Sequence, residues 1–280
     1  MRALNRGFTL VEILIVVVIL GLIMAMAAVL LRAVSITQKR SLTASRMANV
    51  EAAIVQFVML TRRLPCPADG SQSASLGGQE MYNSVTGACI TQQNGVVPWR
   101  SLGLSASDIL DGWDRRMTYR VAPGLMADKA LDLSWCDPAG TLTYVAGSPC
   151  SITCTSSTLG NCTKPSDVLA GKGFLIRNLA LTNVMDPAAT PSTGAAYVLI
   201  SHGESGGGAF LDTGILGTST STDGTEEQKN YANLDVVGTG GYYVDDQSTD
   251  IAGAAHFDDV VVRPSVLSVA SKAGLGPRQH

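Results

Sequence analysis

The chain has 280 residues, of which 46 % are apolar and 15 % are charged, and its formal net charge at pH 7 is −3. This composition excludes a disordered chain and a polytopic membrane protein, and the length suffices for one or two domains with a substantial core. A nucleic acid is also not expected as a direct partner, because the sequence has no cluster of Lys and Arg to contact phosphates.

The N-terminal part of the chain is one long apolar run. Residues 8–31 contain a single charge, Glu12, whereas the sequence beyond Arg32 has the composition of a soluble protein. As a helix rising about 1.5 Å per residue, this run would be roughly 36 Å long, which is enough to cross a bilayer. The sequence therefore predicts one membrane-spanning segment at 8–31 and no second one.

The predicted helix continues beyond this segment with one apolar face. Apolar residues recur there at spacings of three and four, which is typical of an amphipathic helix. They are Met47, Val50, Ile54, Phe57 and Val58. No proline interrupts the pattern before Pro65, where the helix has to end. We expect residues 32–63 to be the amphipathic half of one continuous helix.

Residues 64–280 are expected to form a globular head. They are rich in Gly, Ser, Thr and Pro and contain short runs of β-branched and aromatic residues, which predict short strands. The expected strands lie at 117–121, 142–145, 174–176, 197–200 and 260–262. The predicted fold class is α+β, in which a mostly antiparallel sheet covers the apolar face of the long helical spine.

Two short helices are also expected in the head. Ser105 and Asp108 form the pattern of a capping box, and the helix after it would end at Gly112. Near the C-terminus, Pro264 in the first turn and Gly274 at the end would bracket a second helix.

All six cysteines lie in the head, and their even number predicts disulfides in an oxidising compartment. A zinc site built from the last four stays open as an alternative, although the C-x2-C pair typical of structural zinc is missing. Proximity in the sequence favours a pair between the first two cysteines and a pair between the last two. The cysteines are Cys66, Cys89, Cys136, Cys150, Cys154 and Cys162.

A secretory signal peptide is the alternative to a retained helix. A basic start and an apolar stretch precede Ala25-Met26-Ala27, which fits a cleavage site. However, the apolar run continues beyond that site, and a charged side chain within it costs about 2.5–3.5 kcal/mol at the bilayer centre. Under this alternative the protein would be a secreted hydrolase or binding protein.

One motif in the head matches a hydrolase pattern. Gly203-Glu204-Ser205-Gly206-Gly207 fits G-x-S-x-G, and His256 follows downstream. That nucleophile elbow requires a helix directly after the serine, and the glycines here are a poor helix start. The sequence therefore predicts a hairpin loop, no catalytic residue, and a protein that is not an enzyme.

The first residues resemble a processing signature. Arg6-Gly7-Phe8-Thr9-Leu10-Val11-Glu12 is similar to the signature shared by type IV pilins and type II secretion pseudopilins. The resemblance implies that a prepilin peptidase cleaves between Gly7 and Phe8, removing the leader 1–7, and that the new amino group of Phe8 is methylated. It also implies that Glu12 pairs with the Phe8 amine of a neighbouring subunit, which would offset the cost of a carboxylate in apolar surroundings.

The resemblance further implies a structural subunit held in the bacterial inner membrane with its head in the periplasm. An inner-membrane assembly platform would then extract it into a pilus or related filament, where other pilin subunits are its partners and the cell surface its destination. The large head, residues 64–280, favours a minor pilin over the main repeating subunit.

A type II secretion pseudopilin is the alternative within this family. Segments 111–119 and 257–261 are similar to two segments of major pseudopilins, although Asp114 and Arg115 replace the glycine and asparagine that follow the tryptophan in that family. Because the family's C-terminal acidic loop can bind calcium, the resemblance implies calcium ligands at Asp258 and Asp259. A solvated acidic turn is the other interpretation, and no other cofactor is expected.

Overall fold

The computed structural model describes residues 10–128, 130–131, 169, 171–218, 223–234, 241–249, 251 and 253–276, without the side chains of 27–33. The predicted cleavage site at Gly7 and Phe8 and the expected strand at 142–145 lie outside these residues. The same holds for Cys136, Cys150, Cys154 and Cys162, so the pair between the last two cysteines and the zinc alternative stay predictions.

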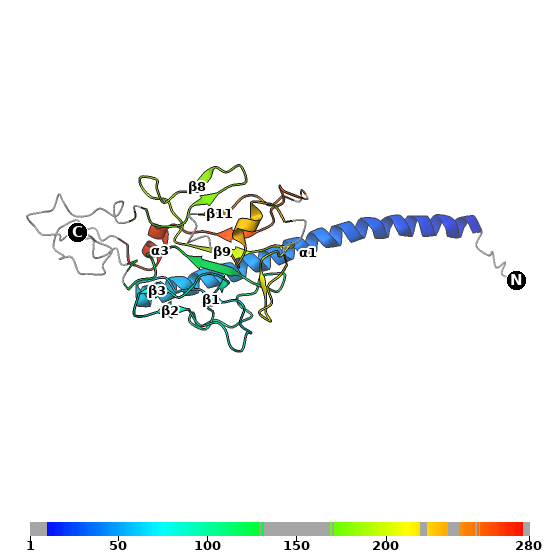
Figure 1. Cartoon of the computed structure of the whole chain (residues 1–280). Helices are drawn as coiled ribbons and strands as arrows, with labels where there is room; N and C mark the ends of the chain where they lie inside the picture. The colour runs from blue at the N-terminus through cyan, green and yellow to red at the C-terminus, as the bar shows by residue number, and fades with distance from the viewer. Residues whose placement is uncertain are drawn as a thin grey trace, which may run out of the picture.

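The long N-terminal helix is confirmed. Helix α1 runs from Leu10 to Thr61 without interruption. Figure 1 shows its N-terminal part extending away from the head as a rod, while its C-terminal part packs against the head. The helix ends as Arg62 adopts a positive φ of 59°, shortly before Pro65, whose ring cannot continue a helix.

The C-terminal half of α1 buries one face in the core of the head. Four residues of the predicted stripe are fully buried and the fifth, Phe57, is half-buried, so the amphipathic pattern is confirmed. The buried four are Met47, Val50, Ile54 and Val58. They form one apolar cluster with side chains of the central sheet, so burial on one face fixes how the helix lies under the head.

A five-stranded antiparallel sheet forms the centre of the head, in the order β1-β4-β6-β9-β12. Its strands are β1 (Ala68–Asp69), β4 (Gly95–Val96), β6 (Thr118–Val121), β9 (Tyr197–Ser201) and β12 (Val260–Val262). Every residue of β6 and β9 is buried, so both faces of the middle of the sheet are covered. The strands expected at 117–121, 197–200 and 260–262 are thus confirmed, as is the mostly antiparallel sheet of an α+β fold.

Smaller elements surround this sheet. Two strand pairs are β2 (Tyr82–Asn83) with β3 (Ala88–Cys89), and β5 (Arg115–Arg116) with β10 (Phe210–Leu211). A three-stranded sheet contains β7 (Ile176–Arg177), β8 (Asn183–Met185) and β11 (Tyr243–Val244). The helices are the 3-10 helix η3 (Glu227–Asn230) and α3 (Val266–Lys272). The expected strand at 174–176 corresponds to β7, which begins two residues later. The pairing of β7 with β11 is parallel, a departure from the otherwise antiparallel pattern.

Two local expectations were wrong in part. Residues 106–109 form turns rather than a helix, and Leu110 forms a β-bridge with Arg116. The capping hydrogen bonds from Ser105 to the Asp108 carboxylate are nevertheless present at 2.6 and 2.8 Å. The reason for the missing helix is tertiary, because the Met117 N–H bonds the Ile109 carbonyl and draws this segment beside the sheet. At the C-terminal helix, Ser265 is the N-cap and Pro264 precedes it, so the proline is not in the first turn.

Candidate functional site

The exposed surface of α1 is almost free of charge. Residues 10–26 are exposed on all sides, and Glu12 lies among them in the first helical turn. The exposed positions between 34 and 60 bear small, amide, hydroxyl or apolar side chains and no charged one. Within the described parts of α1, Glu12 is therefore the only charged residue at an exposed position.

The other charged side chains of the C-terminal half of α1 lie against the head. Arg46 donates from one guanidinium nitrogen to the carbonyls of Leu110 and Asp111, each at 3.0 Å. Glu51 accepts from the Tyr197 hydroxyl at 3.5 Å, and Lys39 lies over the Trp113 ring. The head thus contacts the charges that α1 carries in this half, and an uncharged face remains outside. A helical projection of residues 34–60 could have revealed this face from the sequence.

A membrane span was predicted for 8–31. In the described part of the chain, no helical stretch is both long and apolar enough to cross a membrane.

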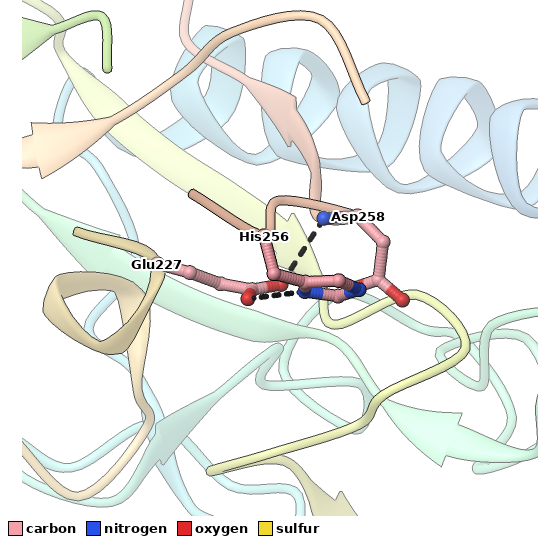
Figure 2. Close-up of side chains that lie close together, drawn as sticks. All are labelled: Glu227, His256 and Asp258. Atoms are coloured by element: carbon pink, nitrogen blue, oxygen red, sulfur yellow. Dashed lines mark hydrogen bonds and ion pairs between the residues drawn. The ribbon is translucent and has the colours of Figure 1, made fainter. Parts of the chain in front are cut away.

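A second group of functional candidates lies inside the head, where Glu227 contacts the segment that precedes β12. Glu227 Oε2 accepts from the Gly224 N–H at 2.9 Å and lies 2.8 Å from His256 Nδ1. Its other oxygen accepts from the Asp258 N–H at 3.1 Å. Figure 2 shows the three side chains of Glu227, His256 and Asp258 lying together at this junction. One carboxylate thus ties η3 to the start of β12.

Burial shifts the pKa values of this group. Burial, followed by the charge of Asp259, raises the pKa of Glu227 from 4.5 to about 7. Burial also raises the pKa of Asp259. For His256, burial lowers the pKa, but the hydrogen bond and charge of Glu227 together with the charges of Asp258 and Asp223 outweigh it and raise the pKa above its ordinary value. Protons are therefore held more tightly here than on exposed side chains.

Asp258 and Asp259, the predicted calcium ligands, are both buried, so the interpretation as a solvated acidic turn is wrong. The Asp258 carboxylate accepts from the Ser205 N–H at 2.7 Å and from its hydroxyl at 2.9 Å. Asp259 accepts from the Asn230 side-chain amide at 2.8 Å, and its other oxygen lies 3.6 Å from His202 Nδ1. Asp258 thus contacts the Ser205 turn, whereas Asp259 contacts Asn230 of η3 and His202. Calcium binding by this pair stays a prediction.

The segment with the G-x-S-x-G pattern is a glycine-rich turn that follows β9. Gly203 has a φ of +51°, and a Cβ there would overlap the carbonyl of Asp258. No helix follows Ser205 in the described residues up to 218. The predicted loop is confirmed, although it leads to β10 in another sheet and is therefore not a simple hairpin. Its role is to bring Ser205 to Asp258.

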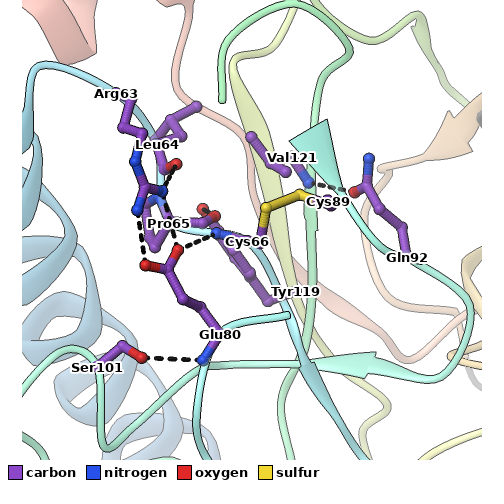
Figure 3. Close-up of a disulfide and its surroundings, with 10 residues drawn as sticks. All are labelled: Arg63, Leu64, Pro65, Cys66, Glu80, Cys89, Gln92, Ser101, Tyr119 and Val121. Carbon is purple, nitrogen blue, oxygen red and sulfur yellow. Dashed lines mark hydrogen bonds and ion pairs between the residues drawn. A yellow bond between two sulfur atoms is a disulfide. The ribbon is translucent and has the colours of Figure 1, made fainter. Parts of the chain in front are cut away.

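The predicted Cys66–Cys89 disulfide is present, with Cα atoms 5.4 Å apart. Figure 3 shows that it lies beside an ion pair between Arg63 and Glu80. Both terminal nitrogens of Arg63 donate to the Glu80 carboxylate, at 2.7 and 2.9 Å, and the Cys66 N–H donates to the same carboxylate at 2.9 Å. The disulfide and the ion pair together fasten the end of α1 to the loop that carries β2 and β3.

Comparison with known proteins identifies the N-terminal segment. Residues 2–28 match the model of the prokaryotic N-terminal methylation motif. This motif is the signature of type IV pilins and pseudopilins, so the sequence resemblance is confirmed for this segment. No curated protein and no solved structure matches the chain.

Proposed function

We propose that the chain is a structural subunit, a minor pilin of a type IV pilus or related filament, which assembles through α1. The observation that carries this proposal is the charge distribution on α1: of its described exposed positions, only Glu12 is charged. The methylation motif at 2–28 supports assembly with other pilin-like subunits.

An uncharged helix surface of this length is unusual in water. Solvent-exposed helix faces ordinarily carry charged or strongly polar residues. Between 34 and 60, however, alanines and serines are frequent at the exposed positions, and small residues allow helices to approach closely. In a filament, the helices of neighbouring subunits would cover both this face and the apolar residues 10–26.

Glu12 would direct the assembly. A carboxylate surrounded by apolar helices is costly unless a cation lies beside it. Cleavage after Gly7 would create a new amino group on Phe8, and the Phe8 amine of one subunit would pair with Glu12 of the next. A subunit inserted out of register would bury both charges separately, so the pair would select one axial position.

Before assembly, residues 8–31 would hold the subunit in the bacterial inner membrane, with the head in the periplasm. That compartment is oxidising and permits the Cys66–Cys89 disulfide. Prepilin peptidase would process the subunit at the other side of the membrane, where the leader 1–7 lies. An inner-membrane assembly platform would then transfer the subunit into the filament. We do not propose a catalytic activity, because Ser205 lies in a turn and donates its hydroxyl to Asp258.

The test is the composition of sheared filaments from cells that express Glu12→Ala. We expect this variant to be cleaved at Gly7 but to be depleted from filaments by more than about tenfold, because the register-setting pair is worth at least about 1.4 kcal/mol. Gln56→Ala, at an exposed position of the same helix, is the matched control and should assemble normally. Normal incorporation of Glu12→Ala would refute the pairing.

Intact mass of the mature chain tests the processing step separately. We expect the chain to begin at Phe8 with one added methyl group. A mature chain that begins after Ala27 would refute the proposal and favour a secreted protein released by signal peptidase.

One observation favours a type II secretion pseudopilin as a second candidate. The segment 111–115, which resembles major pseudopilins, is organised by the buried Asp111 and lies directly on α1. Asp111 accepts from the N–H groups of Trp113 and Arg115 at 2.8 and 3.0 Å, and the Gly112 N–H donates to Thr43 on α1 at 2.9 Å. If the chain is a pseudopilin, its deletion abolishes enzyme secretion and leaves twitching and adhesion unchanged; the minor-pilin proposal predicts the reverse.

A further inference from the structure

Three side chains in the head could bind one metal ion. Glu227, His256 and Asp258 each offer one ligand atom, and these atoms all lie within 4.8 Å of one another. Glu227 comes from η3, and the other two come from the segment that leads into β12, as Figure 2 shows. The side chains of Glu227 and His256 are 2 % and 14 % exposed, so the group is largely shielded from water.

The chemistry of this group differs from that of a calcium site. Calcium prefers six to eight oxygen ligands, whereas an imidazole nitrogen with two carboxylates suits zinc and similar ions. A tetrahedral ion with bonds of about 2.0–2.1 Å places its ligand atoms about 3.3 Å apart. Glu227 Oε2 lies 2.8 Å from His256 Nδ1, and no two ligand atoms of the group are more than 4.8 Å apart. Side-chain movements of about 0.5–1.5 Å would therefore bring them to this spacing.

The charge of the surrounding interior also points to a cation. Glu227, Asp258 and Asp259 are buried. Among the described residues, Glu227 forms an ion pair with His256, and Asp259 forms one with His202. Asp259 Oδ1 and His202 Nδ1 are buried without a hydrogen bond, 3.6 Å apart. Buried carboxylates are stable when paired or when they coordinate a metal. A bound divalent cation would offset this excess of negative charge.

From the ligand geometry and this charge excess, we infer that Glu227, His256 and Asp258 bind one divalent transition-metal ion of the zinc class, with water completing its coordination. The ion would join η3 to the start of β12 and, through Asp258, to the Ser205 turn. The site is separate from the exposed surface of α1, so the inference does not depend on assembly into a filament.

The test is Zn²⁺ binding by the full-length chain, purified in detergent, stripped with EDTA and measured by isothermal titration calorimetry. We expect one Zn²⁺ per chain, and we expect His256→Ala and Glu227→Gln each to weaken binding by more than about tenfold, since even residues that only support metal ligands contribute 10–100-fold. His280→Ala removes another imidazole of the chain and is the matched control, which should bind Zn²⁺ unchanged. Circular dichroism checks that each variant is folded.

The cysteines outside the described residues could also bind zinc, and Co²⁺ substitution separates the two sites. We expect the Co²⁺ complex to lack the near-ultraviolet charge-transfer band of a thiolate ligand, because the proposed ligands are nitrogen and oxygen. Zn²⁺ binding that survives in both His256→Ala and Glu227→Gln would overturn the inference, as would a thiolate band or a chain that binds Ca²⁺ but not Zn²⁺.

Discussion

The exposed surface of α1 and the interior around Glu227 invert the usual distribution of charge in opposite ways. On α1, the fully exposed positions between 34 and 60 carry no charge. Around Glu227, three carboxylates are buried beside the buried His202 and the half-buried His256. Proteins ordinarily place charges outside and apolar groups inside, so each region indicates a missing or unusual partner. For α1 the partner would be another subunit, and for the interior it would be a cation or a bound proton.

The largest effect is expected when a charge is placed on the uncharged surface. Ala48 is exposed on α1, one helical turn from Ala52. Ala48→Glu should reduce incorporation into filaments by more than about tenfold, because an unpaired carboxylate would be buried between helices. The measurement is the ratio of variant to wild-type chain in sheared filaments.

The matched control for this variant is Val85→Glu, which adds the same charge at the tip of the β2–β3 turn, where Val85 is 92 % exposed. Both variants should keep the thermal stability of the head, since neither side chain is in the core. If Ala48→Glu assembles as well as Val85→Glu, the uncharged face is not an assembly surface.

The second prediction removes a charge from the interior. Asp258→Ala should lower the free energy of unfolding of the head by about 2–3 kcal/mol, because the Ser205 N–H and hydroxyl lose a charged acceptor. Asp258→Asn keeps one acceptor oxygen and should cost about half as much. Urea denaturation followed by tryptophan fluorescence measures both values. Equal stability of Asp258→Ala and wild type would mean that this buried charge is dispensable to the fold.

The two regions also differ in how far the sequence could predict them. Periodicity was sufficient for α1 and for the strands at 118–121 and 197–201, because burial on one face or on both dictates the residue pattern locally. Glu12 lies in the first turn of this helix, and its role in assembly stays a prediction. The sequence analysis missed the uncharged exposed face in the C-terminal half of α1. That face is visible in the sequence only when the polar positions of the helix are inspected as closely as the apolar ones.

The interior network could not be predicted in this way. Glu227 and His256 are 29 residues apart, and no short motif links them, so only the tertiary fold brings them together. Asp258 and Asp259 were predicted from a resemblance, but their burial and their separate partners follow from how the Ser205 turn and η3 pack. The expected helix after Ser105 failed for a related reason, since backbone pairing with Met117 overrides the local capping signal.

The third prediction concerns the boundary between the two regions, where the segment 111–115 lies on α1. A Cβ at Gly112 would overlap the carbonyl of Lys39. Gly112→Ala should therefore displace the segment and destabilise the head by about 2 kcal/mol, as overpacking does. Gly21→Ala, where a Cβ has open space, is the control and should leave head stability unchanged in thermal unfolding. A head that tolerates Gly112→Ala without loss would show that this contact with α1 is loose.

The smallest expected effect is a pH dependence of head stability, measured in EDTA so that no metal is bound. Folding raises the pKa of Glu227 from 4.5 to about 7, so the folded state binds this proton more tightly than the unfolded chain. The stability that it contributes is present at low pH and is lost as the pH rises from about 4.5 through 7. The raised pKa of His256 acts with the same sign, since its contribution is lost as the pH rises through its folded-state pKa.

The free energy of unfolding should therefore fall by about 1–2 kcal/mol between pH 6 and pH 8. This fall is smaller than the whole pKa shift of Glu227 implies, because Glu227 and His256 titrate together. Glu227→Gln removes the titrating carboxyl but keeps an oxygen that can accept from the Gly224 N–H, so its stability should change less with pH. Chemical denaturation of both proteins at the two pH values measures this difference. A wild-type head that becomes more stable at pH 8 would contradict the raised pKa of Glu227 and would mean that its carboxylate is ionised in the folded state.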